Sequence, residues 1–166
     1  MLIDSADALP GDLVFCHGTG VVSRAIRLAE RLHWQGGDFY NHVAVLDMQT
    51  PTGWTVIQAE SRGVTRGRAL STIAPGGSYS IVRAPSDAFR ADILAFARSQ
   101  VGSDYGFLTI ASIVLTILVP GSISFMFPNS WICSALAAEA LRCGGWVHSW
   151  PVMAQVSPAQ LWEALA

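Results

Sequence analysis

The sequence predicts a single α+β domain, residues 1–166, in which an antiparallel sheet packs against helices. Apolar runs of strand length alternate with Gly, Pro and polar turns, and amphipathic stretches with capping residues occupy windows of helix length. Of the 166 residues, 51% are hydrophobic and 13% are charged, about half the usual charged share. This composition excludes a disordered chain. With 10 basic against 12 acidic residues and no basic stripe, nucleic acid is not an expected partner.

Four apolar runs predict the strands, which span residues 13–16, 42–47, 54–60 and 79–83. A turn over residues 50–53 joins the second run to the third, so these two are expected to form a hairpin. The Gly- and Arg-rich residues 61–68 that follow are expected to form a loop.

Helices are expected over residues 24–32, 87–101, 133–142 and from 158 onward. Ser23 and Ser86 can cap the first two, because a serine side chain accepts from the free N–H groups of a first turn. The last helix has a capping box, in which Ser157 is the N-cap, Pro158 takes the first helical position and Gln160 completes the S-x-x-Q pattern.

An uncharged block runs from Tyr105 to Ala138 and contains no Asp, Glu, Lys or Arg. Its most apolar part, residues 107–127, is interrupted by Pro120 and Gly121. A membrane-spanning helix needs about 20 apolar residues, and this part reaches that length only with the Pro-Gly pair inside it. Three interpretations stay open: a buried helix or hairpin, a transmembrane span, or a surface that docks on a membrane or a protein assembly. We expect an insertion that is partly exposed, because the predicted elements leave little room to cover so many apolar side chains.

A cysteine, a histidine and a glutamate form the candidate catalytic set. Cys133 follows a polar turn and opens a helix-forming run, and a helix N-terminus lowers the pKa of a thiol. His42 opens an apolar strand and Glu60 ends the neighbouring one, so strand pairing would bring both to one end of the sheet. Cysteine hydrolysis needs a thiolate, an imidazole and a polar group that fixes the imidazole. The competing interpretation is a small buried Cys133 on a core helix and a core histidine at position 42.

The other cysteines are less suited to catalysis. Cys16 and His17 are adjacent in a predicted strand, so their side chains point to opposite faces and cannot form a nucleophile–base pair. Cys16 and Cys143 are interpreted as structural. Three cysteines without a C-x-x-C spacing fit neither a disulfide framework nor a zinc site, so no metal is expected. The first twelve residues contain acids and no basic residue, so no signal peptide is expected and the localisation stays unknown.

Seven short motifs carry a resemblance to a known family. They are P-G-D-L-V-F, S-R-A-I-R, N-H-V-A-V, Q-A-E-S-R-G-V, I-V-R-A-P, V-G-S-D-Y-G and W-I-C-S-A-L, and they extend from about Pro10 to Leu141. In this order they resemble the permuted branch of the NlpC-type papain-like cysteine hydrolases, which is related to lecithin:retinol acyltransferase-like proteins. In that branch the histidine strand precedes the cysteine helix, as it does here. The H-V-A-V, E-S-R-G-V and C-S elements are the most specific part of the resemblance.

The resemblance implies a circularly permuted papain-like (NlpC-type) fold. It implies Cys133 as nucleophile, His42 as general base and acid, and Glu60 as the residue that orients the imidazole. Tyr105 matches the tyrosine of the family's G-x-x-Y element, which implies a position near the site and a part in substrate binding. No metal or organic cofactor is implied. The sequence departs from the family in its apolar residues 107–127 and in Ala135, which stands where many relatives carry Glu.

Three functions follow from these observations. The leading one is a cysteine peptidase or amidase that cleaves an amide bond in peptidoglycan-derived peptides. The second is a lipid-directed acyltransferase or hydrolase that uses residues 107–127 as a membrane or acyl-chain dock. The third is a papain-like module held in a larger assembly, such as a virion tail or envelope complex, by the same residues. The expected partner is a peptide or lipid substrate with an amide or ester bond.

Overall fold

The computed structural model describes residues 1–17, 40–85, 89–106, 130–149 and 156–166. This part of the chain is a mixed α+β structure with mostly antiparallel strand pairing and four α-helices. Its strands are β1 (Leu2–Ile3), β2 (Leu13–Cys16), β3 (His42–Thr50), β4 (Gly53–Glu60), β5 (Gly63–Ala69), β6 (Tyr79–Val82), β7 (Asp104–Tyr105) and β8 (Ser130–Trp131). Its helices are α2 (Leu70–Ile73), α3 (Arg90–Ser99), α5 (Cys133–Cys143) and α6 (Pro158–Leu165), with a 3-10 turn at Pro75–Gly77.

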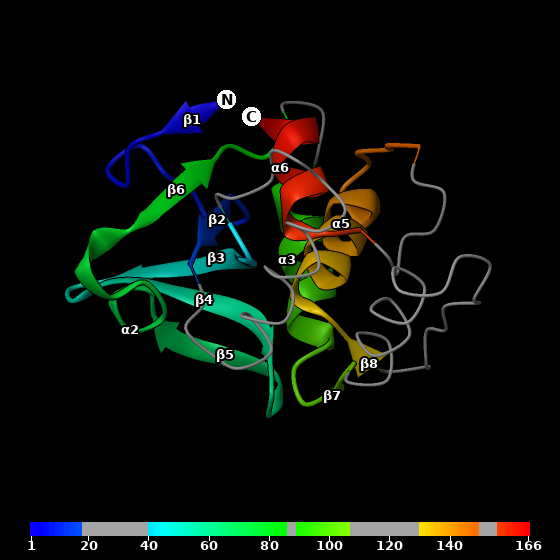
Figure 1. Ribbon diagram of the computed structural model, residues 1–166, viewed down its shortest axis with the longest axis horizontal. Helices are drawn as coiled ribbons and strands as arrows, with labels where there is room; N and C mark the ends of the chain where they lie inside the picture. The colour runs from blue at the N-terminus through cyan, green and yellow to red at the C-terminus, as the bar shows by residue number, and fades with distance from the viewer. Residues whose placement is uncertain (18–39, 86–88, 107–129, 150–155) are drawn as a thin grey trace, which may run out of the picture.

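Six strands form one antiparallel sheet in the order β1-β6-β2-β3-β4-β5, and β7 and β8 form a separate parallel pair (Figure 1). The predicted hairpin is confirmed, because β3 and β4 pair from Thr50↔Gly53 to Val45↔Ile57. The predicted loop over residues 61–68 is wrong: β5 pairs with β4 through most of that range. Its polar, Gly-containing sequence suits an edge strand, because such a strand forms by pairing with one neighbouring strand and does not require both of its faces to be buried.

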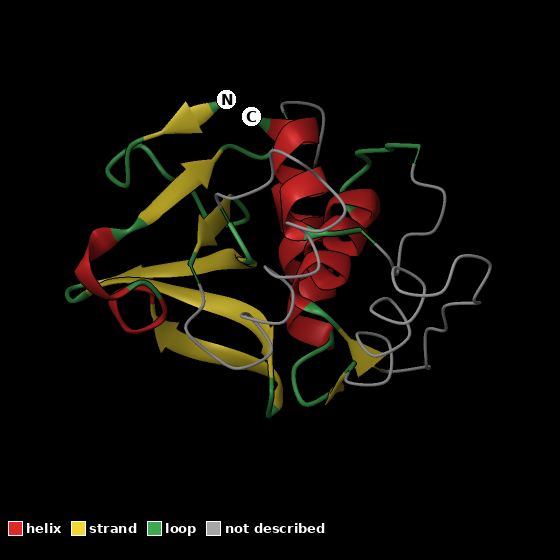
Figure 2. Ribbon diagram, in the orientation of Figure 1, coloured by secondary structure: helices red, strands yellow, loops and turns green. Residues whose placement is uncertain are grey.

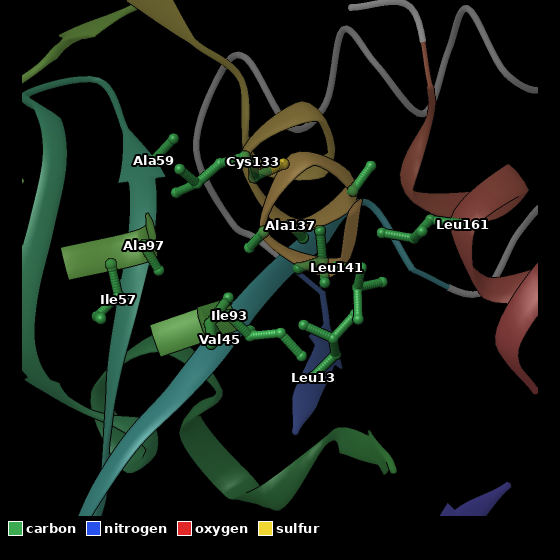
Figure 3. Packing of buried hydrophobic residues seen from close by; sticks show 14 of the residues in the cluster. Leu13, Val45, Ile57, Ala59, Ile93, Ala97, Cys133, Ala137, Leu141 and Leu161 are labelled. Carbon is green, nitrogen blue, oxygen red and sulfur yellow. The ribbon is translucent and has the colours of Figure 1, made fainter. Parts of the chain in front are cut away.

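Helices α3, α5 and α6 gather on one side of the sheet, and α2 lies on the other (Figure 2). α5 packs against both α3 and α6, and it also contacts β3 and β4. The strands divide their side chains between two buried clusters with the two-residue period of a pleated strand. In β2, Leu13 and Phe15 enter the cluster under α3, α5 and α6, whereas Val14 and Cys16 enter the cluster beside α2. Figure 3 shows the first cluster, with Cys133 at its border.

The helix predicted over residues 87–101 starts later than expected: α3 begins at Arg90, and its N-cap is Phe89, which makes no side-chain hydrogen bond to the first turn, so the predicted cap at Ser86 is wrong. α5 begins at Cys133, and α3 occupies most of the predicted window. At α6 the capping box is formed: Ser157 Oγ accepts from the N–H of Gln160 at 3.1 Å, and Gln160 Oε1 accepts from the N–H of Ser157 at 2.9 Å. The predicted helix over residues 24–32 and the apolar insertion at 107–127 lie outside the described residues. Within the described ranges, no helix has both the length and the apolar character that a membrane crossing needs.

Candidate active site

Cys133 is the first residue of α5 and is buried, with 4% of its surface exposed. The residue before it, Ile132, is an extended N-cap without a side-chain hydrogen bond to the first turn. The N–H groups of that turn are therefore available to the cysteine, and the N–H of Ser134 donates to its sulfur. A thiol in this position ionises more readily, because the helix terminus carries partial positive charge.

The sulfur of Cys133 meets β3 near the point where β3 and β4 separate. Pairing between these strands ends at Val45↔Ile57, although β3 begins at His42 and β4 continues to Glu60. The backbone N–H of Val43, which lies beyond the last β3–β4 pair, donates to Cys133. The N-terminus of α5 thus uses a backbone donor that the β3–β4 ladder leaves free.

His42 lies between Cys133 and Gln58. Its Nε2 is 2.7 Å from Oε1 of Gln58, a residue of β4 with 2% of its surface exposed. An amide oxygen only accepts, so Nε2 carries the proton of this contact. Nδ1 is then the ring nitrogen available for the hydrogen bond between His42 and Cys133. The ring joins a thiol on one side to a neutral amide on the other.

Burial and pairing act in opposite directions on the two titrating groups. Burial by itself lowers the pKa of His42, but the hydrogen bond and charge of Cys133 outweigh burial and raise that pKa above 6.5. Gln58 and Glu60 add smaller contributions to the raised pKa. Burial by itself raises the pKa of Cys133, but the hydrogen bond and charge of His42, with two backbone N–H groups, lower it below 9.0. Both directions favour a thiolate–imidazolium pair.

Glu60 ends β4 as predicted, but its hydrogen bonds go to β5. Its Oε1 accepts from Thr65 Oγ1 at 3.1 Å, and its Oε2 accepts from Arg68 at 2.5 Å. The ring contact expected of Glu60 is made by Gln58, which corrects the predicted partner of His42. The physical reason is that β3 and β4 stop pairing before His42. The ring therefore reaches Gln58, which is diagonal to it, rather than Glu60, which continued pairing would place directly opposite.

Gln58 is the site residue that sequence reasoning missed. It shares a face of β4 with Glu60, because side chains two positions apart in a strand point the same way. Its neighbours Ile57 and Ala59 belong to the core under α5. Gln58 therefore points to the face of β4 opposite that core, and it needs a polar partner because it is only 2% exposed. The alternation of apolar and polar residues in this strand is typical of a strand with one solvent-facing side, so the sequence carries no signal that could have identified Gln58.

Tyr105, the last residue of β7, lies near Cys133. Burial, followed by the charge of Cys133, raises the pKa of its hydroxyl above 10.0, so the hydroxyl keeps its proton at neutral pH. The turn before β7 is bound to β5, because the N–H of Val64 donates to the carbonyl of Ser103 at 2.9 Å. A Cβ at Gly63 would clash with that carbonyl, and Gly63 also has a φ of 100°, so the close approach requires glycine.

The other two cysteines are unsuited to the same chemistry. Burial, followed by the charge of Cys133, raises the pKa of Cys16 to about 12, and its sulfur lies 3.9 Å from the carbonyl oxygen of Ile73. Cys143 is exposed at the opposite end of α5, where burial and the charge of Glu139 raise its pKa. Of the three cysteines, only Cys133 has a lowered pKa.

A thiol that ionises readily, next to a ring that can hold and return a proton, can attack a carbonyl carbon and protonate a leaving group. Among the residues that the structure describes, no three His, Cys, Asp or Glu side chains gather in a way that suits a metal ion. Compared with known proteins, the sequence matches no family model and no curated protein.

Proposed function

We propose that this protein is a cysteine hydrolase that cleaves an amide bond through Cys133, His42 and Gln58. The observation that carries the proposal is the hydrogen-bonded chain from the Cys133 thiol through the His42 ring to Gln58. A cysteine that only filled core space would have a raised pKa, as Cys16 does, because burial disfavours the thiolate. The pKa of Cys133 moves the other way although the residue is buried.

In the proposed reaction, the thiolate of Cys133 attacks the carbonyl carbon of the amide, and an electron pair moves to the carbonyl oxygen. The backbone N–H of Cys133 stabilises this oxyanion. As the C–N bond breaks, the imidazolium of His42 gives its proton to the departing amine, and a thioester remains. Neutral His42 then takes a proton from water, the hydroxide attacks the thioester, and the acid product leaves as the C–S bond breaks. Gln58 holds the ring through both steps.

We further propose that the fold is a circularly permuted papain-like fold of the NlpC type. Three features support this proposal. The histidine strand precedes the cysteine helix along the chain, that helix packs against the histidine strand, and the main sheet is antiparallel. In this fold, residues 107–127 are an insertion between Tyr105 and Cys133.

The proposed substrate is a peptide derived from peptidoglycan. Its support is the motif resemblance together with the chemistry of the site, where an imidazolium can protonate an amine leaving group. The lipid-directed alternative depends on residues 107–127, which lie outside the described residues, and it enters the test as an outcome.

The test incubates the full chain with muropeptides and, separately, with phosphatidylcholine vesicles, and identifies the products by mass. We expect muropeptide cleavage by the wild type and by Cys143→Ala, and none by Cys133→Ala. Cys143→Ala is the matched control, because it removes a thiol from the other end of the same helix. Acyl-chain release from vesicles without muropeptide cleavage would replace the proposal with the lipid-directed function. Cleavage by Cys133→Ala would refute the assigned nucleophile.

A further inference from the structure

A cavity lies at the edge of the sheet where β1 ends, away from the residues of the candidate active site. Its volume is about 780 Å³, within the range of about 300–1,000 Å³ that is typical of small-molecule sites. The residues that line it belong to β1, to the segment 4–7 and to the segment 77–83, which contains β6. In the sheet, β2 lies between β6 and β3, the strand that carries His42 (Figure 1).

At this cavity, part of the β6 edge has no neighbouring strand. The N–H of Arg83 donates to the carbonyl of Met1 at 3.0 Å, so the alternation of an antiparallel ladder directs the backbone N–H and C=O of Ile81 and Tyr79 to the same side. β1 pairs with Ile81 but ends at Ile3, and in the described part of the chain no strand lies opposite Tyr79 on this side. One backbone donor and one backbone acceptor of Tyr79 therefore point to the open edge, where Tyr79 lines the cavity.

Arg83 also lines the cavity, and its positive charge has no carboxylate partner among the described residues. Its Nη2 donates to the backbone carbonyl of Asp7 at 3.0 Å, and its buried Nε has no hydrogen-bond partner. Other arginines in the described part of the chain each bind a carboxylate, namely Arg66, Arg68, Arg90, Arg98 and Arg142. A guanidinium that is held by a neutral carbonyl and keeps unused donors is suited to a carboxylate from outside the chain.

Two carboxylates line the same cavity without pairing with Arg83. Asp4 and Asp7 take part in hydrogen bonds with the described residues through their backbone groups, while their side chains have no such partner. Two negative charges beside one positive charge would repel a multiply charged anion. A ligand that carries both a carboxylate and an ammonium group meets both signs of charge.

We propose that this cavity binds a short peptide with free termini, at a site separate from Cys133. The terminal carboxylate of the peptide pairs with Arg83, and its ammonium group lies against Asp4 and Asp7. A peptide group between the two ends pairs with the backbone of Tyr79, as an added strand does at a sheet edge. The inference goes beyond the proposed function, because binding here requires no reaction at Cys133.

The test is an NMR titration of the full chain, isotope-labelled at its backbone amides, with triglycine as the probe. Triglycine has both charged ends and no side chains, and Cys133→Ala is the background for every titration so that the site cannot hydrolyse the probe. We expect saturable shifts of the amide signals of Asp4, Asp7 and Tyr79, and unchanged signals around His42.

Two modified probes separate the contributions of the two charges. Triglycine amide lacks the carboxylate, and N-acetyltriglycine lacks the ammonium group. Each is expected to bind about tenfold or more weakly than triglycine, because each loses a hydrogen bond between charged groups.

Arg83→Gln should weaken the binding of triglycine about tenfold or more and have little effect on triglycine amide, because the lost contact is the one to the carboxylate. Arg62→Gln is the matched control, since Arg62 is exposed, has no carboxylate partner among the described residues and lies outside the cavity. If Arg83→Gln does not fold, Asp4→Asn combined with Asp7→Asn provides a second variant at exposed positions. This variant should lose the preference for triglycine over N-acetyltriglycine.

Shifts confined to the surroundings of His42, no saturable binding of triglycine, or equal weakening by Arg83→Gln and Arg62→Gln would overturn the proposal. An unchanged preference between the two probes in the double aspartate variant would do the same. Binding of inorganic phosphate at Arg83 without binding of triglycine would replace the peptide site with a simple anion site. A protein that binds triglycine at this edge but cleaves no amide would leave this inference standing and count against the proposed function alone.

Discussion

Cys133 differs from the other cysteines in a property that can be measured directly. Pairing with His42 lowers its pKa, whereas burial raises the pKa of Cys16 to about 12 and also raises that of Cys143. The thiolate is the form that reacts, so we expect iodoacetamide to alkylate Cys133 first at about pH 6. Its reaction rate should rise with pH and level off below pH 9.0, the ordinary value from which its pKa is lowered.

Peptide mass mapping after limited alkylation measures the order of reaction. Cys143 is exposed and Cys133 is buried, so access alone would favour Cys143. Labelling of Cys143 before Cys133 at about pH 6 would therefore contradict the lowered pKa of Cys133.

Gln58 is expected to affect turnover through the orientation of the ring. Gln58→Ala removes a hydrogen bond to a group that becomes charged, which contributes about 1.5–3 kcal/mol, so kcat should fall roughly 10- to 100-fold. Gln58→Glu keeps an acceptor and adds a charge, which should raise the pKa of His42 and move the alkaline limb of the rate profile to higher pH. Steady-state kinetics across pH, with circular dichroism as a check on folding, measure both effects. Unchanged kcat in Gln58→Ala would assign the orienting role to another group.

At the scale of elements, a side chain beside the nucleophile joins α5 to the segment that leads into α6. Ser134 Oγ donates to the carbonyl of Val156 at 2.5 Å, and both residues are buried. Because the N–H of Ser134 also donates to Cys133, one residue links the start of α5, the nucleophile and the last helix.

Ser134→Ala should leave the Val156 carbonyl without this donor in a buried setting, which costs about 1–3 kcal/mol. A domain of this size loses roughly 2–4 °C of melting temperature for each kcal/mol, so the expected fall is several degrees. Ser99→Ala is the matched control, because Ser99 Oγ donates to the carbonyl of Phe96 at 2.7 Å at an exposed position where water can replace it. Equal falls in the two variants, measured by calorimetry, would contradict the role given to Ser134.

At the scale of the whole molecule, buried carboxylates connect the sheet to α3. Asp47 of β3 has a side chain that is 1% exposed, and it binds Arg66 of β5 at 2.7 Å and Arg98 of α3 at 2.8 Å. Asp12 likewise binds Arg90 of α3. Both aspartates are buried while their arginines reach solvent. Removal of an arginine therefore leaves a buried negative charge, whereas removal of an aspartate leaves a positive charge that water can solvate.

Removal of both partners of Asp47, in Arg66→Met combined with Arg98→Met, would leave a buried charge unpaired and destabilise the protein by about 3–5 kcal/mol. Asp47→Asn should cost less, about 1–2 kcal/mol, because the two arginines, 40% and 41% exposed, can turn to water. Arg142→Met, which breaks the exposed pair with Glu139, is the control and should cost at most about 0.5 kcal/mol. Urea denaturation measures all three, and a larger loss in Asp47→Asn than in the double variant would contradict this account.

Features that depend on local periodicity and capping can be predicted from the sequence. Strands β2, β3, β4 and β6, the β3–β4 hairpin, the start of α5 at Cys133 and the capping box of α6 are all found where local patterns predict them. These signals act over a few neighbouring residues, so they do not depend on the rest of the fold. The same signals identify Cys133 and His42 as candidates, because each opens its own helix or strand.

Which residues come into contact depends on the pairing of segments that are distant in the sequence. β5 is a strand because β4 pairs with it, although its own composition is that of a loop. The place of Glu60 and the partner of His42 depend on where β3 separates from β4, at Val45↔Ile57, and no local pattern encodes that point. Because the strands separate before reaching His42, Gln58 contacts the ring and Glu60 turns to β5. Pairing between distant segments sets these contacts, and a change of one position in strand register would be enough to exchange them.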